Sequence, residues 1–104
     1  MFAGTVARYV RAFCSTFHEL SILPYDVPPG TDFEVLDFYV APKVRRTRVG
    51  ARAAALLFER HRGNGVLLTL AANAGAQAFW RATLAACTRD VVEHDAATMF
   101  TFRA

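Results

Sequence analysis

The first apolar positions of the chain recur at helical spacing. Steps of three and four residues connect Val6, Tyr9, Val10, Phe13 and Phe17. Such steps place side chains on one face of an α-helix, so the pattern predicts a core-facing helix over residues 3–20. The next segment, residues 21–30, contains three prolines and ends in glycine, which excludes a helix there. We expect a short edge strand up to Pro24, followed by a turn at 28–30.

The middle of the chain alternates between strand and helix patterns. Residues 33–40 are rich in β-branched and aromatic side chains and are followed by Pro42, which is typical of a strand, here expected in the centre of a sheet. Residues 49–62 are rich in alanine and leucine, with a basic last turn and Gly63 just beyond, and predict a helix. The apolar run 65–71 begins at a glycine and indicates a parallel strand that is buried on both faces.

The last third of the chain predicts another helix and the end of the sheet. Asn73 is a suitable N-cap for a helix over residues 74–87, and the apolar residues at 91–92 and 99–102 indicate one or two closing strands. From residue 33 onward the predicted order is strand, helix, strand, helix, strand. This order predicts an α/β or α+β fold with a right-handed crossover. In such a unit a ligand is expected beyond the carboxyl end of a strand, where the next helix begins.

Length and composition favour one soluble domain. The chain has 104 residues, of which 54% are apolar and dispersed among charges. Its longest apolar stretch, residues 51–58, is interrupted by Arg52 and is shorter than the about 20 residues that span a bilayer. Cys14 and Cys87 lack metal-ligand spacing, so we interpret them as buried thiols of a cytoplasmic protein, and we expect no metal site.

Positive charge is concentrated between the clearest strand and the clearest helix. The net charge is +3, and four arginines and one lysine lie within residues 43–52. The first N–H groups of a helix lack partners and carry partial positive charge, so a phosphate bound there would satisfy both. The cluster therefore favours a local anion site over a nucleic-acid surface, although charge alone also fits a solvated basic loop.

Two sequence motifs indicate which anion would bind at this site. In the first, Arg45, Val49 and Gly50 follow a strand and open a helix, and this segment resembles the Arg/Gln-x-x-Gly-x-Gly/Ala acyl-CoA-binding motif of the GNAT acetyltransferase superfamily. The second resembles the family's next motif and comprises Asn73, Ala76, Ala78, Phe79 and Trp80, followed by Arg81. The resemblance extends over residues 34–89.

The resemblance implies a GNAT-like mixed sheet with a strand-turn-helix CoA-binding unit. We expect one domain over residues 1–104, in which 34–104 form the CoA-binding half. Residues 1–33 would form a short N-terminal helix and an edge segment, with most of the N-terminal part of the family fold missing. An exposed sheet edge would then favour a homodimer.

The resemblance also implies an activity, which is transfer of an acetyl group from acetyl-CoA to an amine of unknown identity. The strand ending at Val40 would splay to bind the pantetheine arm, and the amides of the turn would hold the pyrophosphate. The residues implied in cofactor binding are Tyr39, Val40, Val44, Arg45, Arg46, Arg48, Val49, Gly50, Ala51, Asn73 and Phe79. No nucleic acid or membrane partner is expected.

Two carboxylates on the central strand are candidates for the general base. Asp37 lies within four residues of the turn and is the first candidate, with Glu34 in reserve. On a regular strand these two side chains point to opposite faces, so only one could share a face with the cleft. Alternatively, each carboxylate lies in solvent or pairs with a nearby arginine.

Two positions depart from the family pattern. Arg48 replaces the first glycine of the motif, where its side chain would either hinder the pyrophosphate and strain the turn or contact a phosphate. Trp80 replaces the family's tyrosine acid, and we expect it to be a packing residue. These departures leave a second hypothesis open, a GNAT-like binding or interaction module without transferase activity. A small basic nucleic-acid-binding domain is a more distant third.

Overall fold

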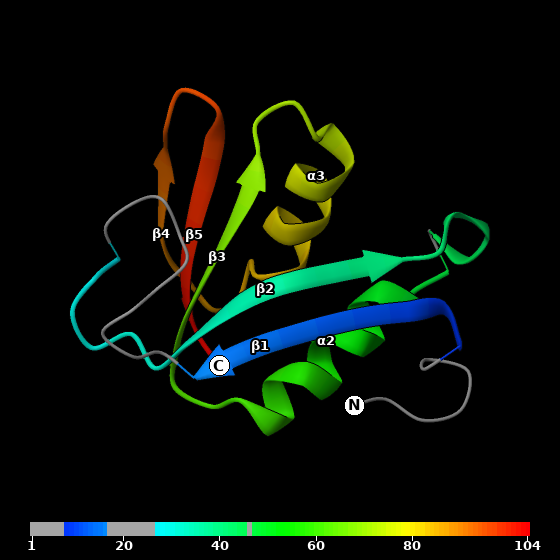
Figure 1. The fold of residues 1–104 in the computed structure, drawn as a ribbon, viewed down its shortest axis with the longest axis horizontal. Helices are drawn as coiled ribbons and strands as arrows, with labels where there is room; N and C mark the ends of the chain where they lie inside the picture. The colour runs from blue at the N-terminus through cyan, green and yellow to red at the C-terminus, as the bar shows by residue number, and fades with distance from the viewer. Residues whose placement is uncertain (1–7, 17–26, 46) are drawn as a thin grey trace.

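The computed structural model describes residues 8–16, 27–45 and 47–104 (Figure 1). Within these ranges the elements, in chain order, are β1 (Val10–Thr16), β2 (Phe33–Val40), the 3-10 turn η1 (Pro42–Val44), α2 (Val49–Arg60), β3 (Asn64–Leu70), α3 (Ala74–Thr83), β4 (Thr88–Glu93) and β5 (Ala97–Arg103). None of the helices in the described part of the chain is long and apolar enough to cross a bilayer.

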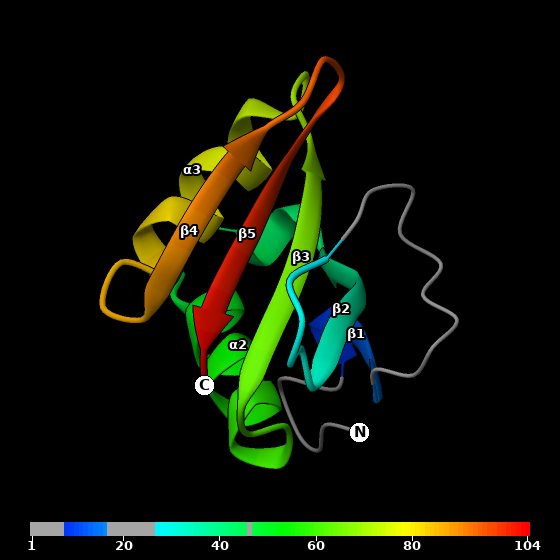
Figure 2. The same cartoon turned by 90° about the vertical axis from the view of Figure 1, so that its left-hand side faces the viewer.

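The five strands of the described ranges form one mixed sheet in the order β1-β2-β3-β5-β4. β2 and β3 are parallel, as predicted, and the other neighbouring strands are antiparallel. α2 and α3 lie on the same face of this sheet (Figure 2). We call this the helix face, and we call the opposite side the far face. The predicted α+β class and the order strand, helix, strand, helix, strand are confirmed from residue 33 onward.

The helix predicted over residues 3–20 is wrong for residues 10–16, which form β1. Val10 and Cys14 are buried, whereas Arg11 and Phe13 are exposed, so apolar burial follows the period of a strand. Val10 and Phe13 also fit a helical spacing, but pairing with β2 decides the outcome. The remaining parts of the predicted helix beyond residues 8–16, and the predicted edge strand up to Pro24, lie outside the described residues.

The other elements were predicted closely. β2 spans the predicted residues 33–40, and the turn predicted at 28–30 is present, where the Thr31 hydroxyl donates to the Pro28 carbonyl at 2.7 Å. Both helices are shorter than expected: α2 ends at Arg60 and α3 at Thr83. α3 stops because the chain turns at Leu84, whose carbonyl accepts the Thr88 amide and hydroxyl, each at 2.7 Å.

The core between the sheet and the helices is built on aromatic rings. Phe33 and Phe102 from the sheet lie with their ring centroids 5.7 Å apart, and Phe58 of α2 lies 5.0 Å from Phe102. Gly65 of β3 makes room for them, because a Cβ atom there would lie 2.5 Å from Phe102 and 2.7 Å from Phe33. The packing of these rings fixes α2 across β2 and β3.

A bulge in β2 changes the direction of its side chains. Phe13 pairs with Asp37 and Cys14 with Val35, so Leu36 is an extra residue without a partner on β1. As a result Val35 packs in the helix-face core before the bulge and Phe38 after it. Glu34 and Asp37 therefore both point to the far face. The prediction that only one of them could share a face with the cleft is wrong, because the strand is not regular.

β2 and β3 diverge soon after they meet. Their pairing is limited to Phe33–Val35 with Gly65–Leu67, and beyond these residues the two strands separate (Figure 1). α2 follows the carboxyl end of β2 and α3 follows that of β3. The expected splay of β2 is thus confirmed. We call the diverging ends of the two strands the β2 arm and the β3 arm of the splay; α2 begins after the first and α3 after the second.

Candidate functional site

The turn between β2 and α2 is held by its own hydrogen bonds. The Val44 amide donates to the Ala41 carbonyl at 3.1 Å, and the Thr47 hydroxyl donates to the Val44 carbonyl. The Arg45 side chain folds back, and its Nε donates to the Val40 carbonyl at 3.0 Å. These bonds satisfy polar groups of the turn within the turn itself.

The first amides of α2 have no acceptor within the helix. The first helical bond runs from the Arg52 amide to the Arg48 carbonyl at 2.9 Å, so the N–H groups of Val49, Gly50 and Ala51 precede it. Arg48 makes no side-chain cap, and the first turn of α2 contains no acidic residue. A hollow of about 430 Å³ lies at this point, lined by Thr47, Arg48, Val49, Ala51 and Arg52. Amides without an acceptor in the helix, together with two arginines, make this hollow suitable for an anion.

Arg48 has a left-handed backbone, with φ 68° and ψ 0°. Among the described residues, Arg48 is the only one other than glycine that has a positive φ. Glycine adopts this conformation without the steric cost that a Cβ atom brings, which explains why the family motif has glycine at this position. Of the two consequences left open by the sequence, backbone strain is therefore present. The side chain is nevertheless exposed, and Arg48 lines the hollow.

Gly50 joins three elements beneath the turn. A Cβ atom at this position would lie 2.9 Å from Cε1 of Phe79 and 3.3 Å from Cγ2 of Val40. The absence of a side chain thus lets the start of α2 approach both the end of β2 and the side of α3. Phe79 in turn stacks on Phe38, with 5.5 Å between ring centroids. The side chains of Val40 and Phe79 consequently pack against the start of α2 at Gly50.

The remaining sequence-predicted binding residues divide between the two arms of the splay. Tyr39 and Val44 lie with the turn on the β2 arm, where the Arg45 guanidinium lies 5.8 Å from the Tyr39 ring centroid. Asn73 lies on the β3 arm and caps α3, since its Oδ1 accepts the Ala76 amide at 3.0 Å, as predicted. Arg46 lies outside the described residues.

Trp80 packs in the core, in agreement with the sequence-based expectation. It is 5% exposed, and its ring lies 4.9 Å from Phe38 and 4.9 Å from Phe79. The ring is therefore buried between α3 and β2, and it has an indole N–H, not an acidic hydroxyl, at the position of the family's tyrosine. This position supplies no acid for the leaving thiolate.

The two candidate bases differ in accessibility. Asp37 lies two residues beyond Val35, the last residue of β2 that pairs with β3, and its side chain is 39% exposed. Its Oδ2 accepts the Arg11 Nε at 2.6 Å and its Oδ1 accepts Nη2 at 3.4 Å, and this contact raises the pKa of Arg11. Glu34 is only 3% exposed. Asp37 is thus the carboxylate that a substrate could reach from solvent.

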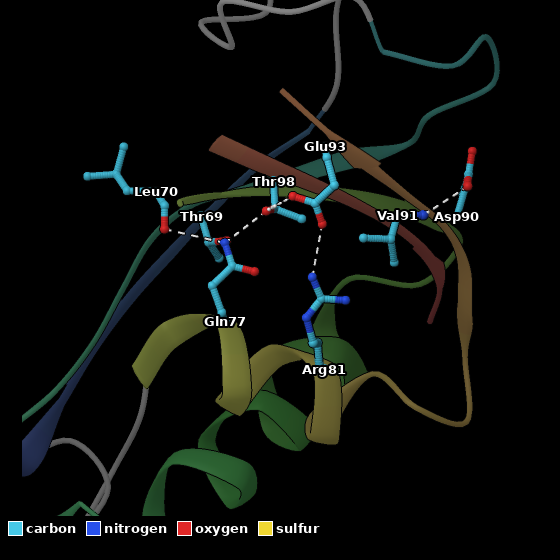
Figure 3. Close-up of polar contacts among 8 residues, drawn as sticks. All are labelled: Thr69, Leu70, Gln77, Arg81, Asp90, Val91, Glu93 and Thr98. Atoms are coloured by element: carbon cyan, nitrogen blue, oxygen red, sulfur yellow. Dashed lines mark hydrogen bonds and ion pairs between the residues drawn. The ribbon is translucent and has the colours of Figure 1, made fainter. Parts of the chain in front are cut away.

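A polar network that the sequence did not predict holds α3 to the β3 arm (Figure 3). The Gln77 side-chain amide donates to the hydroxyls of Thr69 at 2.7 Å and Thr98 at 2.9 Å. The Thr98 hydroxyl donates to Glu93 at 2.8 Å, and Arg81 contacts the same carboxylate at 3.0 Å. The hydrogen bond from Thr98, with a smaller contribution from Arg81, lowers the pKa of Glu93. The network fixes the start of α3 beside Asn73.

The described residues contain no group of three histidine, cysteine, aspartate or glutamate side chains that could hold a metal ion. A protein-family model described as the acetyltransferase (GNAT) family matches residues 4–84. The matched range includes β1, β2, α2, β3 and α3, and so it contains both arms of the splay. No protein of curated function matches the chain.

Proposed function

The chain belongs to the acetyltransferase (GNAT) family, and from this premise we propose that it transfers the acetyl group of acetyl-CoA to the nitrogen of an amine. The single observation that carries the proposal is the start of α2, where three amides have no helical acceptor and two arginines line a hollow. A pyrophosphate bound there would accept hydrogen bonds from these amides and would be neutralised in part by Arg48 and Arg52.

The pantetheine arm would extend along β2 into the splay. Beyond Val35, β2 has β1 on one side and no pairing with β3 on the other. Backbone groups on that side have no partner on β3 and, apart from the Val40 carbonyl that accepts from Arg45, could bind an extended ligand as an added strand. This path leads from the hollow toward Asp37 and would bring the thioester to the point where β2 and β3 separate.

The transfer itself requires little more than proximity and a proton acceptor. The amine arrives as an ammonium ion, and the Asp37 carboxylate takes one of its protons. The free nitrogen attacks the thioester carbonyl, a C–N bond forms, and the C–S bond breaks. The thiolate of CoA leaves and takes up the second proton that the nitrogen loses as it becomes an amide. Binding both reactants at the splay supplies the rest of the rate enhancement.

A binding module without transferase activity is the second candidate, favoured by the burial of Trp80 where the family has its acid. Thiol release from acetyl-CoA across a panel of amines separates the two candidates. Transfer that falls at least tenfold in Asp37→Asn, with unchanged CoA affinity, supports the enzyme. CoA binding without thiol release for any amine supports the module.

The binding site is tested with one charge placed at two positions of α2. Ala51 and Ala55 are both exposed, but only Ala51 lines the hollow. Ala51→Glu adds a carboxylate beside the expected pyrophosphate, and we expect calorimetry to show CoA affinity reduced by about tenfold or more. Ala55→Glu, one turn further along, is the matched control and should bind nearly as the wild type. Equal affinities of the two variants would place the CoA site elsewhere.

A further inference from the structure

Four side chains of β1 and β2 form a patch on the far face of the sheet. Arg11 pairs with Tyr39 and Phe13 pairs with Asp37 across the two strands. Directly opposed residues share a face, and this face is turned away from the helices because Phe38 packs against them. Phe13 is 54% and Tyr39 41% exposed, which is unusual for aromatic residues. We call these four residues the β1–β2 patch.

The β1–β2 patch already holds an organic cation, which the chain itself supplies. The Arg11 Nε lies 2.6 Å from Oδ2 of Asp37, and its Cζ lies 5.1 Å from the centroid of the Tyr39 ring. A carboxylate beside an aromatic face is the combination that binds ammonium and guanidinium groups. Phe13 lies directly across from Asp37 and adds an exposed apolar ring to the same place.

We propose that the β1–β2 patch is the acceptor subsite of the transferase, that it binds a primary ammonium group carrying an apolar or aromatic substituent, and that Arg11 occupies it until the amine arrives. The inference rests on the proposed function and names the class of its acceptor. Asp37 would hold the ammonium group, Tyr39 would cover it, and Phe13 would contact the substituent. Arg11 is a positioning residue that competes with the substrate for the carboxylate.

Arg11 is well suited to be displaced. Its side chain is 69% exposed and that of Asp37 39%. For an exposed ion pair of this kind, the equilibrium constant favours the paired over the separated state by no more than about fivefold. A second guanidinium, that of Arg45, lies 5.8 Å from the Tyr39 ring centroid. Arg45 cannot take its place readily, since it is tied to the Val40 carbonyl at 3.0 Å.

The test measures ammonium binding without acetyl-CoA, by NMR titration of the backbone amides of β1 and β2. The probe is 2-phenylethylammonium, and 2-phenylethanol is its neutral counterpart. In Arg11→Gln the competing cation is gone, so the affinity for the ammonium probe should rise by about three- to fivefold. Arg11→Lys retains a cation and should bind nearly as the wild type. Asp37→Asn should lose binding.

Arg81→Gln is the matched control, because Arg81 and Glu93 form a similarly exposed ion pair away from the β1–β2 patch. Its affinity should equal that of the wild type. The inference is overturned if Arg11→Gln binds the probe no more tightly than the wild type, if 2-phenylethanol shifts the same amides equally, or if Asp37→Asn still binds. If the amide spectrum of Arg11→Gln loses its dispersion, that variant is misfolded. The Arg11→Lys and Asp37→Asn results then decide whether the inference holds.

The failure of this inference and the failure of the proposed function are distinguishable. If the ammonium probe binds as expected but no amine is ever acetylated, the transferase proposal fails, the patch is no acceptor subsite, and it stands only as an ammonium-binding site. If amines are acetylated while Arg11→Gln leaves their affinity unchanged, the acceptor binds elsewhere and only this inference fails.

Discussion

The left-handed backbone at Arg48 provides the sharpest prediction. A residue with a Cβ atom costs about 1–2 kcal/mol in this conformation, whereas glycine does not. Glycine also has more conformational freedom in the unfolded chain, which offsets about 0.5–1 kcal/mol of that difference. Arg48→Ala and Arg48→Gly both remove the guanidinium, so comparing them isolates the backbone. We expect Arg48→Gly to be more stable than Arg48→Ala by about 0.5–1 kcal/mol.

The assay is urea denaturation of both variants, with equal dependence on urea concentration as the condition for comparing them. Arg52 provides the control, because it lies in the right-handed helix one turn later. There the order should reverse, with Arg52→Gly less stable than Arg52→Ala by about 1 kcal/mol. If Arg48→Gly is no more stable than Arg48→Ala while the Arg52 pair behaves as expected, position 48 is not left-handed and the account of the motif glycine is refuted.

Three further predictions concern packing, capping and a buried thiol. Gly50→Ala should destabilise the protein by about 1–3 kcal/mol, because its Cβ would lie 2.9 Å from Phe79. Gly75→Ala in α3 is the control and should stabilise the protein, because its Cβ would meet only the Asn73 Oδ1 at 3.8 Å. Thermal unfolding that ranks the two variants the other way contradicts this packing. Asn73→Ala should lose about 1 kcal/mol in urea denaturation and Asn73→Asp should lose less, because aspartate can still cap; equal losses would argue against the cap. Burial raises the pKa of Cys14 from 9.0 to about 12, so a thiol reagent at pH 8 should modify it about a thousandfold more slowly than in the unfolded chain. Since the folded pKa is the higher one, the contribution of Cys14 to stability is complete below pH 9.0 and falls as the pH rises toward about 12, and rapid labelling of the folded protein would contradict its burial.

The close approach of Gly50 to Phe79 and Val40 also changes what a large substitution at this position can test. From the motif alone, Gly50→Trp is expected to fill the approach to the start of α2. In the structure, a side chain at this position points at Phe79 and Val40 and would disrupt the packing of α2 on β2 and α3. Loss of CoA binding in Gly50→Trp would therefore not distinguish a blocked site from a distorted fold. Ala51 is the better position, because it lines the hollow itself.

The sequence predicted those elements whose signal is local. β2 is defined by its β-branched and aromatic residues, α2 by its helix-forming residues, and Asn73 by its capping side chain, and all three lie where the pattern put them. β1 was missed because Val10 and Phe13 fit the spacing of a helix, whereas in the strand Val10 and Cys14 are buried and Phe13 is exposed. Only its pairing with β2, 17 to 30 residues further along the chain, decides between a helix and a strand.

The candidate site shows the same division. The basic turn and the start of α2 follow from neighbouring residues, and the motif located them. The shared face of Glu34 and Asp37 could not be predicted, since the bulge that creates it exists only in the pairing of β2 with β1. Arg11 meets Asp37 across the same pairing, and Gln77 meets Thr98 across 21 residues of sequence. Both contacts depend on strand order, which no local pattern contains.

The extra residue in β2 has a consequence for how this strand tolerates changes in length. Leu36 resets the phase of the strand, so that residues on either side of it follow two different alternation frames. Deleting Leu36 would make Val35 and Asp37 consecutive, opposite the consecutive residues Cys14 and Phe13, so Asp37 and Tyr39 would stay on the far face and Phe38 in the core. A single-residue deletion at the bulge would thus straighten the strand and still preserve the inside and outside of its carboxyl half.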